Sequence, residues 1–188
     1  MIIKNIARLC RERKRICLYD DQNGGCQWIG DGSAAYPLFG MPVIDERTVF
    51  AVLDIPEDKR DGYLVSYSAW PERLNSGDED DTERVLSPSD CGLVFKDMKL
   101  MPARTGRGLW FYDPKYRNPL RDLENVELYE RTASDGGLYL AAKTGLLLRA
   151  VIMPKLPEPE KLERELETLL AELRDTIERS GEETEEEE

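Results

Sequence analysis

The chain has 188 residues, of which 34% are charged and 40% hydrophobic, and its formal net charge is -12. Together with a mean hydropathy of -0.54, these values predict one soluble globular body with an appendage. The absence of histidine excludes Ser-His and Cys-His nucleophilic sites. No apolar run reaches the roughly 20 residues that span a bilayer, and the apolar stretch at the start is too short for a secretory signal, so we expect a cytoplasmic protein.

Charge is unevenly distributed along the chain. Residues 1–15 hold six basic residues and one acid, whereas residues 156–188 hold four basic and fourteen acidic residues. The two ends therefore have net charges of +5 and -10, and the middle has -7. Opposite signs at the two ends indicate that the protein works through oppositely charged surfaces.

Residues 2–15 predict a short amphipathic helix. At 100° per residue, the isoleucines lie on one side, and four cations lie within an arc of about 60° on the other. This basic ridge suits weak contacts with the phosphates of a nucleic acid, although the acidic remainder of the chain would repel a duplex. A face that is solvated, or neutralised by acidic groups of this chain or a neighbour, is the alternative. The ridge consists of Lys4, Arg8, Arg11 and Arg15.

The middle of the chain predicts mainly strands. An Asn-Gly turn within "RICLYDDQNGGCQWIGDG" predicts a hairpin of strands near 15–20 and 25–30, and a helix is expected from about 45 to 54, with Asp45 as its N-cap. Further strands are expected in "GYLVSYSAW", "RVLSP", "CGLVF", "MKLMPAR" and "GLWFYD". Residues 126–154 predict three strands, the first two joined at "SDGG". We therefore predict an α+β fold with a largely antiparallel sheet, a short N-terminal helix and a long C-terminal amphipathic helix.

Prolines 154, 157 and 159 separate the expected α+β body, 1–155, from an amphipathic acidic helix over 156–180. Residues 181–188 are expected to form a disordered acidic tail because their like charges repel one another. The apolar stripe of the helix covers an arc of about 80°. It either packs on the sheet of the body or pairs with a second copy as a short coiled coil, giving a homodimer through this helix. The stripe consists of Leu162, Leu166, Leu169, Leu173 and Ile177.

Acidic groups in two segments are candidates for binding a partner with a basic surface. Residues 75–84 form a polar acidic loop, which we expect to be mobile. The second segment is the expected C-terminal helix, in which acidic residues outnumber basic ones, so that its charge is negative like that of the loop. The candidate acidic residues are Asp78, Glu79, Asp80, Asp81, Glu163 and Glu167.

Residues 102–119 interleave cations with aromatic rings. This pattern suits single-stranded nucleic acid, whose bases stack on rings, and equally suits a protein interface. A strand with core-facing aromatic residues is the structural alternative. The candidate residues are Arg104, Arg107, Trp110 and Tyr112.

No segment predicts a cofactor or metal site. The four cysteines, Cys10, Cys17, Cys26 and Cys91, form no C-x-x-C pair, so we expect reduced, partly buried thiols rather than zinc ligands. The glycines of residues 24–34 fit neither a P-loop nor a dinucleotide-binding motif. We therefore expect no metal, no cofactor and no enzymatic activity.

The runs "CQWIGDGSAAYPLFGMP", "LDIPEDKRDGY" and "VELYERTASDGGLYLAAKTGLLLRAVIMP" resemble a group of proteins without assigned activity from prophages and mobile elements of Gram-positive, clostridial-type bacteria. The resemblance implies no catalytic or binding residue. It implies a phage protein that binds a host or phage partner, as an acidic, DNA-mimicking inhibitor of a host defence or nucleic-acid enzyme. A nucleic-acid-associated accessory protein and a structural protein that assembles through its C-terminal helix are the alternatives.

Overall fold

The computed structural model describes residues 2–22, 24–87, 92–95, 98–155 and 168. Apart from Thr168, these residues belong to one compact unit, residues 1–155. Most of the amphipathic helix predicted over 156–180, and all of the tail predicted over 181–188, lie outside the described residues.

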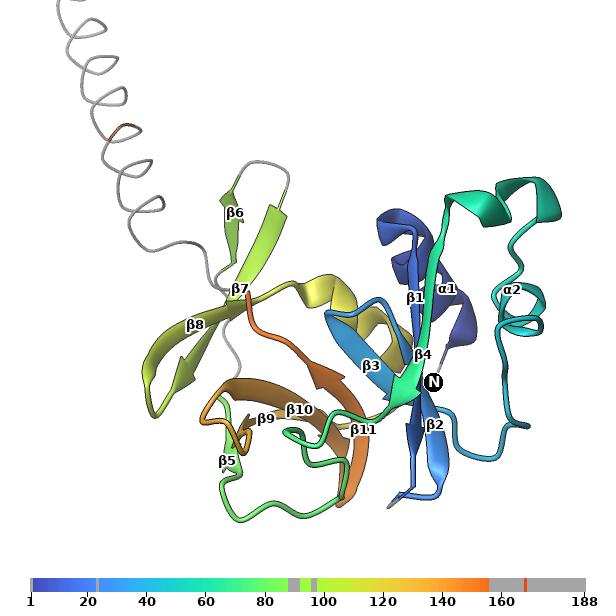
Figure 1. The fold of residues 1–188 in the computed structure, drawn as a ribbon. Coiled ribbons are helices and arrows are strands. Elements are labelled where there is room, and N and C mark those ends of the chain that lie inside the picture. The colour runs from blue at the N-terminus through green and yellow to red at the C-terminus, as the bar shows by residue number, and fades with distance from the viewer. Residues whose placement is uncertain (1, 23, 88–91, 96–97, 156–167, 169–188) are drawn as a thin grey trace, which may run out of the picture. The chain divides into compact units, whose positions relative to one another are not determined.

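The described residues are mostly sheet (Figure 1). Their helices are short: α1 (Ile3–Arg13), α2 (Val49–Val52) and the 3-10 helices η1 (Glu57–Gly62) and η2 (Pro114–Leu120). The strands in chain order are β1 (Arg15–Asp21), β2 (Cys26–Gly30), β3 (Ala34–Pro37), β4 (Leu64–Ala69), β5 (Arg84–Val85), β6 (Leu93–Phe95), β7 (Met98–Thr105), β8 (Gly108–Tyr112), β9 (Val126–Thr132), β10 (Leu138–Thr144) and β11 (Leu147–Ile152).

The strands form two sheets. The larger has eight strands in the order β4-β1-β2-β3-β11-β10-β9-β5, and the smaller has three in the order β6-β7-β8. The eight-stranded sheet is mixed because β4 runs parallel to β1, whereas the neighbouring hairpin β1–β2 is antiparallel. The connection from β1 to β4, which passes through β2, β3, α2 and η1, is long enough to bring the chain back in the direction of β1.

The predicted fold class was wrong. An α+β fold with a largely antiparallel sheet does not describe a structure that is mostly sheet, with a mixed eight-stranded sheet and only short helices among the described residues. The helix expected over 45–54 is shorter in the structure, where α2 has only four residues. Asp45 accepts hydrogen bonds from the backbone N–H groups of Arg47 and Thr48, so the chain turns before the helix begins. Asp54 then has a φ of 52°, which ends the helical conformation.

The helix α1 forms as its apolar spacing predicts. Ile6, Leu9 and Cys10 are buried against the core, and the N–H of Ile2 donates to the backbone oxygen of Pro119 in η2 at 2.8 Å. The helix ends at Lys14, whose left-handed backbone, with a φ of 49°, lets its N–H bond back to Arg11. Arg15 therefore belongs to β1 and not to the helix.

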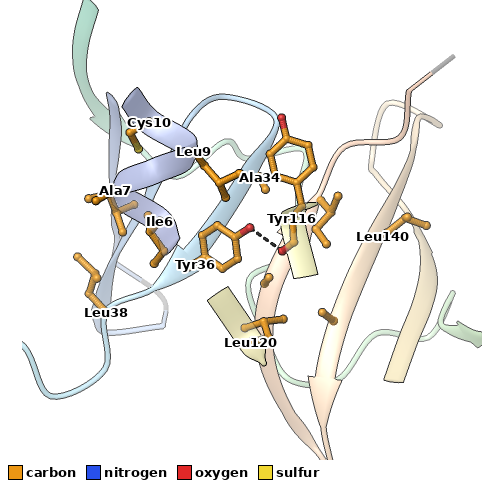
Figure 2. Packing of buried hydrophobic residues seen from close by; sticks show 14 of the residues in the cluster. Ile6, Ala7, Leu9, Cys10, Ala34, Tyr36, Leu38, Tyr116, Leu120 and Leu140 are labelled. Carbon is orange, nitrogen blue, oxygen red and sulfur yellow. Dashed lines mark hydrogen bonds between the residues drawn. The ribbon is translucent and has the colours of Figure 1, made fainter. Parts of the chain in front are cut away.

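Two clusters of buried side chains hold the sheets. The larger cluster joins α1, the first strands, η2 and the later strands, and Figure 2 shows part of it. There, Tyr36 of β3 points toward η2, and its hydroxyl donates to the backbone oxygen of Tyr116 at 2.7 Å. The smaller cluster is built around Trp28, Tyr139 and Leu148.

Candidate functional site

The acidic loop that precedes β5 is fixed by a buried cation. Arg131 of β9 has no exposed surface, and its guanidinium donates to the backbone oxygens of Gly77 at 2.8 Å and Asp78 at 3.0 Å. The same guanidinium contacts the carboxylate of Glu83, at 2.7 Å from Nε and 2.5 Å from Nη2. A loop that we expected to be mobile is thus tied to the sheet through one arginine.

Further contacts fix the same loop. Lys143 of β10 contacts the second carboxylate oxygen of Glu83 at 2.6 Å, so this carboxylate bridges two cations. The carboxylate of Asp78 accepts a hydrogen bond from the N–H of Leu148 at 2.7 Å. Arg131 and Lys143 are buried cations, and buried charges are stable only when they are paired and hydrogen-bonded, as both are here.

Asp80 forms hydrogen bonds with other residues of the loop. Its carboxylate accepts hydrogen bonds from the backbone N–H of Thr82 at 2.9 Å and from the side-chain amide of Asn75 at 3.0 Å. Burial alone would raise the pKa of Asp80, but these hydrogen bonds, the Thr82 hydroxyl and the charge of Arg131 lower it below its usual value. Asp80 is therefore a loop-forming residue.

The remaining two predicted acids of the loop differ from Asp78 and Asp80 in their hydrogen bonding. Glu79 and Asp81 are both exposed, and their side chains make no hydrogen bond or ion pair with the part of the chain that the structure describes. The loop thus combines an internally bonded frame with two outward carboxylates. Glu163 and Glu167, the other predicted acidic residues, lie outside the described residues.

A cleft of about 630 Å³ adjoins the start of this loop. It lies between the β1–β2 turn and the segment after β4, and it includes Asp20, Asp21, Trp70, Arg73, Asn75 and Thr132 in its lining. Trp70 is held at its edge by stacking on Trp28, with ring centroids 4.4 Å apart, and by its indole N–H, which donates to Leu74 at 2.8 Å.

The two aspartates of the cleft accept hydrogen bonds that stabilise the surrounding structure. Asp21 accepts a hydrogen bond from the N–H of Gly24 at 2.9 Å, which closes the β1–β2 turn. Asp20 accepts one from the side-chain amide of Gln27 at 3.0 Å and another from the hydroxyl of Tyr67. The hydrogen bond to Asp20 raises the pKa of Tyr67. These carboxylates add negative charge to the cleft while holding its walls.

The predicted basic ridge is divided in the structure. Lys4, Arg8 and Arg11 are exposed residues of α1, whereas Arg15 lies in β1, beyond the end of the helical spacing. Arg8 is 3.7 Å from the carboxylate of Glu12, and Arg11 donates to backbone oxygens, including that of Leu53 at 3.5 Å. These contacts within the chain satisfy part of the ridge; its predicted binding of nucleic acid stays a prediction.

The aromatic-basic segment also separates into two faces. Tyr112 is buried and Trp110 packs against the larger core cluster, so both rings serve the interior. Arg104 is exposed, and Arg107 donates to the backbone oxygen of Gly136. The structure therefore does not bring these four side chains together on one surface.

The leucine stripe, Leu162, Leu166, Leu169, Leu173 and Ile177, lies outside the described residues. Among the residues described, no group of three or more His, Cys, Asp or Glu side chains is placed to hold a metal ion. Burial, with the charge of Asp31, raises the pKa of the Cys10 thiol to about 12. No helix within the described ranges is long and apolar enough to cross a membrane.

With this geometry in view, the chain was compared with protein-family models, curated proteins and solved structures. None of them matches.

Sequence reasoning missed the residues that organise the loop. Arg131 and Lys143 lie in strands that read as alternating surface and core positions, and nothing local marks them as buried. A signal was nevertheless present, because Asp78, Asp80 and Glu83 concentrate carboxylates in one loop, which calls for a counter-cation in the adjoining strands.

Proposed function

We propose that this chain is a non-catalytic binding protein that engages a basic surface of a partner through carboxylates. Two parts of the chain supply them: the loop that exposes Glu79 and Asp81, and residues 156–188 with their net charge of -10. The proposal concerns recognition alone, and no bond-making step is included in it.

The observation that carries this proposal is the fixation of the loop by Arg131. A loop bonded through Arg131 to Glu83 and to backbone oxygens of residues 77 and 78 holds the backbone that carries Glu79 and Asp81 in place before a partner arrives. Fixing the backbone of a flexible residue costs about 1–2 kcal/mol in conformational entropy, and a loop that is already fixed does not lose this on binding. Preorganisation of charge is thus a physical reason to assign recognition to this loop.

The distribution of net charge along the chain also supports recognition of a basic partner. Residues 1–155 have a net charge of only -2, so most of the -12 of the whole chain is concentrated in residues 156–188. A strong negative segment beside a nearly neutral body attracts a basic partner at long range and raises the rate of association. Basic grooves that bind phosphates are typical of nucleic-acid enzymes, and inhibition of such an enzyme by charge imitation is the form of the function that we propose.

A pair of charge-reversal variants tests the proposal. We would measure binding of a fluorescent oligolysine peptide to the full chain by anisotropy at low salt. The double variant Glu79→Lys/Asp81→Lys should bind markedly more weakly than the matched variant Glu46→Lys/Glu57→Lys, which changes net charge equally at other exposed positions. Equal affinities of the two variants would show that the loop has no special part in recognition.

A further inference from the structure

Strand β4 ends the eight-stranded sheet, and its outer edge is open (Figure 1). The N–H of Leu64 donates to Lys14 at 2.9 Å, and the N–H of Trp70 donates to Asp20 at 2.8 Å. Because backbone groups alternate in direction along a strand, the even-numbered residues of β4 face β1. The N–H and C=O groups of Val65, Tyr67 and Ala69 therefore point away from β1.

These outward groups have no hydrogen-bond partner within the described part of the chain. The strand is also accessible, since Leu64 is 61% exposed and Tyr67 is 43% exposed. Six consecutive residues with an unpaired edge form a template for one more strand.

The sequence of β4 lacks the features that normally protect such an edge. Natural edge strands carry lysine, other charges, proline or a bulge, which prevent pairing with another chain. The strand reads "LVSYSA", without a charged residue or a proline, and its register with β1 is unbroken. The open edge is therefore compatible with pairing and carries nothing that opposes it.

The strand is nearly symmetric about Tyr67. Reading outward in either direction gives a serine, Ser66 or Ser68, and then a small apolar residue, Val65 or Ala69. An antiparallel partner with the same sequence would place Tyr67 opposite Tyr67, serine opposite serine, and Val65 opposite Ala69. This pattern fits a two-fold axis through Tyr67 better than it fits an unrelated strand.

We propose that β4 pairs antiparallel with β4 of a second copy about this two-fold axis. Val65 then pairs with the partner's Ala69, and Tyr67 with the partner's Tyr67, so that the outward backbone groups of both strands are hydrogen-bonded. The two serines of each strand occupy the alternate pairs. Since β4 carries no charge, no like charges meet across the pair.

Tyr67 is held by two hydrogen bonds of its hydroxyl within its own chain. Its hydroxyl donates to Asp20 and accepts a hydrogen bond from Gln27 at 3.2 Å, which keeps the ring over its own sheet. The two tyrosine rings lie on the same face of the extended sheet because paired residues point to the same side. The interface is small, and complexes of this size are weak and transient.

Amide hydrogen exchange on the full wild-type chain tests the proposal at atomic level. At protein concentrations near about 1 mM, the N–H groups of Val65, Tyr67 and Ala69 should exchange slowly, and on dilution they should become fast. Those of Ser66 and Ser68, which face β1, should stay slow throughout. Fast exchange at all three outward positions over the whole concentration range would overturn the proposal, and this readout needs no variant.

Analytical ultracentrifugation adds a variant test. The mass should rise with concentration from 21.5 kDa toward twice that value. Ala69→Pro removes one outward N–H without touching the bonds to β1 and should leave a monomer, whereas Leu109→Ser, at an exposed apolar residue of β8, should still dimerise. A dimer that persists in Ala69→Pro but is lost in Leu169→Asp/Leu173→Asp would instead assign assembly to the leucine stripe and overturn the proposal.

Salt distinguishes this dimer from the proposed partner binding. Added salt screens the repulsion between the two acidic chains and should strengthen the dimer, whereas it should weaken binding of a basic partner. Failure of either idea therefore leaves the other open to its own test.

Discussion

Nε and Nη2 of Arg131 lie 2.7 Å and 2.5 Å from one carboxylate oxygen of Glu83. Lys143 reaches the other oxygen of the same carboxylate at 2.6 Å. This charge cluster joins β9 and β10 to the acidic loop before β5. It thereby fixes the backbone conformation of the loop.

The first prediction concerns this cluster. Replacing Arg131 by methionine removes one of the two cations that pair with Glu83 and takes away the guanidinium that donates to the backbone oxygens of Gly77 and Asp78. We expect the free energy of unfolding to fall by about 3–5 kcal/mol, measured by urea denaturation.

Arg73→Met is the matched control. Arg73 forms an exposed pair with Asp135 at 3.3 Å, and loss of such a pair costs under about 1 kcal/mol. If Arg131→Met and Arg73→Met had the same free energy of unfolding, the charge cluster around Arg131 would not stabilise the loop.

The second prediction concerns acid stability. Because the folded-state pKa of Asp80 is lowered, its contribution to stability is present above the unfolded pKa and is lost as the pH falls through the folded pKa. The wild-type chain should therefore lose stability more steeply than Asp80→Asn as the pH falls below about 4, the unfolded-state pKa of an aspartate. Thermal unfolding curves across this range measure the difference, and parallel pH profiles would contradict the lowered pKa.

Some of this fold could be read from the sequence. The turn "DQNGG" marks the β1–β2 hairpin, and "SDGG" marks the turn between β9 and β10, because both contain residues suited to tight turns. β3 was missed because all four of its residues are buried between β2 and β11, so it shows no alternation.

The rest depends on contacts between distant segments. The parallel pairing of β1 with β4 joins residues such as Ile16 and Val65, which no local pattern connects. Arg131 was missed for a related reason, because a lone arginine in a strand ordinarily indicates a surface position. The exposed acids of the loop could be predicted, whereas the frame that holds them could not.

The third prediction concerns the hydrogen bond between β3 and η2. Tyr36→Phe removes the hydroxyl that donates to the buried backbone oxygen of Tyr116 (Figure 2). The expected loss in the free energy of unfolding is about 1–3 kcal/mol. Tyr129→Phe, which removes an exposed hydrogen bond to Glu127, should change stability by less than about 0.5 kcal/mol. If Tyr36→Phe lowered the free energy of unfolding no more than this control does, the hydrogen bond between β3 and η2 would not contribute to stability.

The fourth prediction concerns cysteine reactivity. Burial raises the pKa of Cys10 to about 12, and its thiol donates to the backbone oxygen of Gly30 at 3.5 Å, so little thiolate forms. Iodoacetamide at about pH 8 should modify the partly exposed Cys26 before Cys10, which should react only after unfolding. Mass spectrometry of the labelled peptides measures the order, and equal rates in the native protein would show that Cys10 is accessible.

The central claim is recognition of a basic surface by carboxylates, and the dependence of affinity on salt tests it most directly. Binding of oligolysine to the full chain should weaken at least about tenfold between low salt and about 0.5 M salt, because screening acts on exposed charges. An affinity that stays constant across this range would contradict recognition through charge.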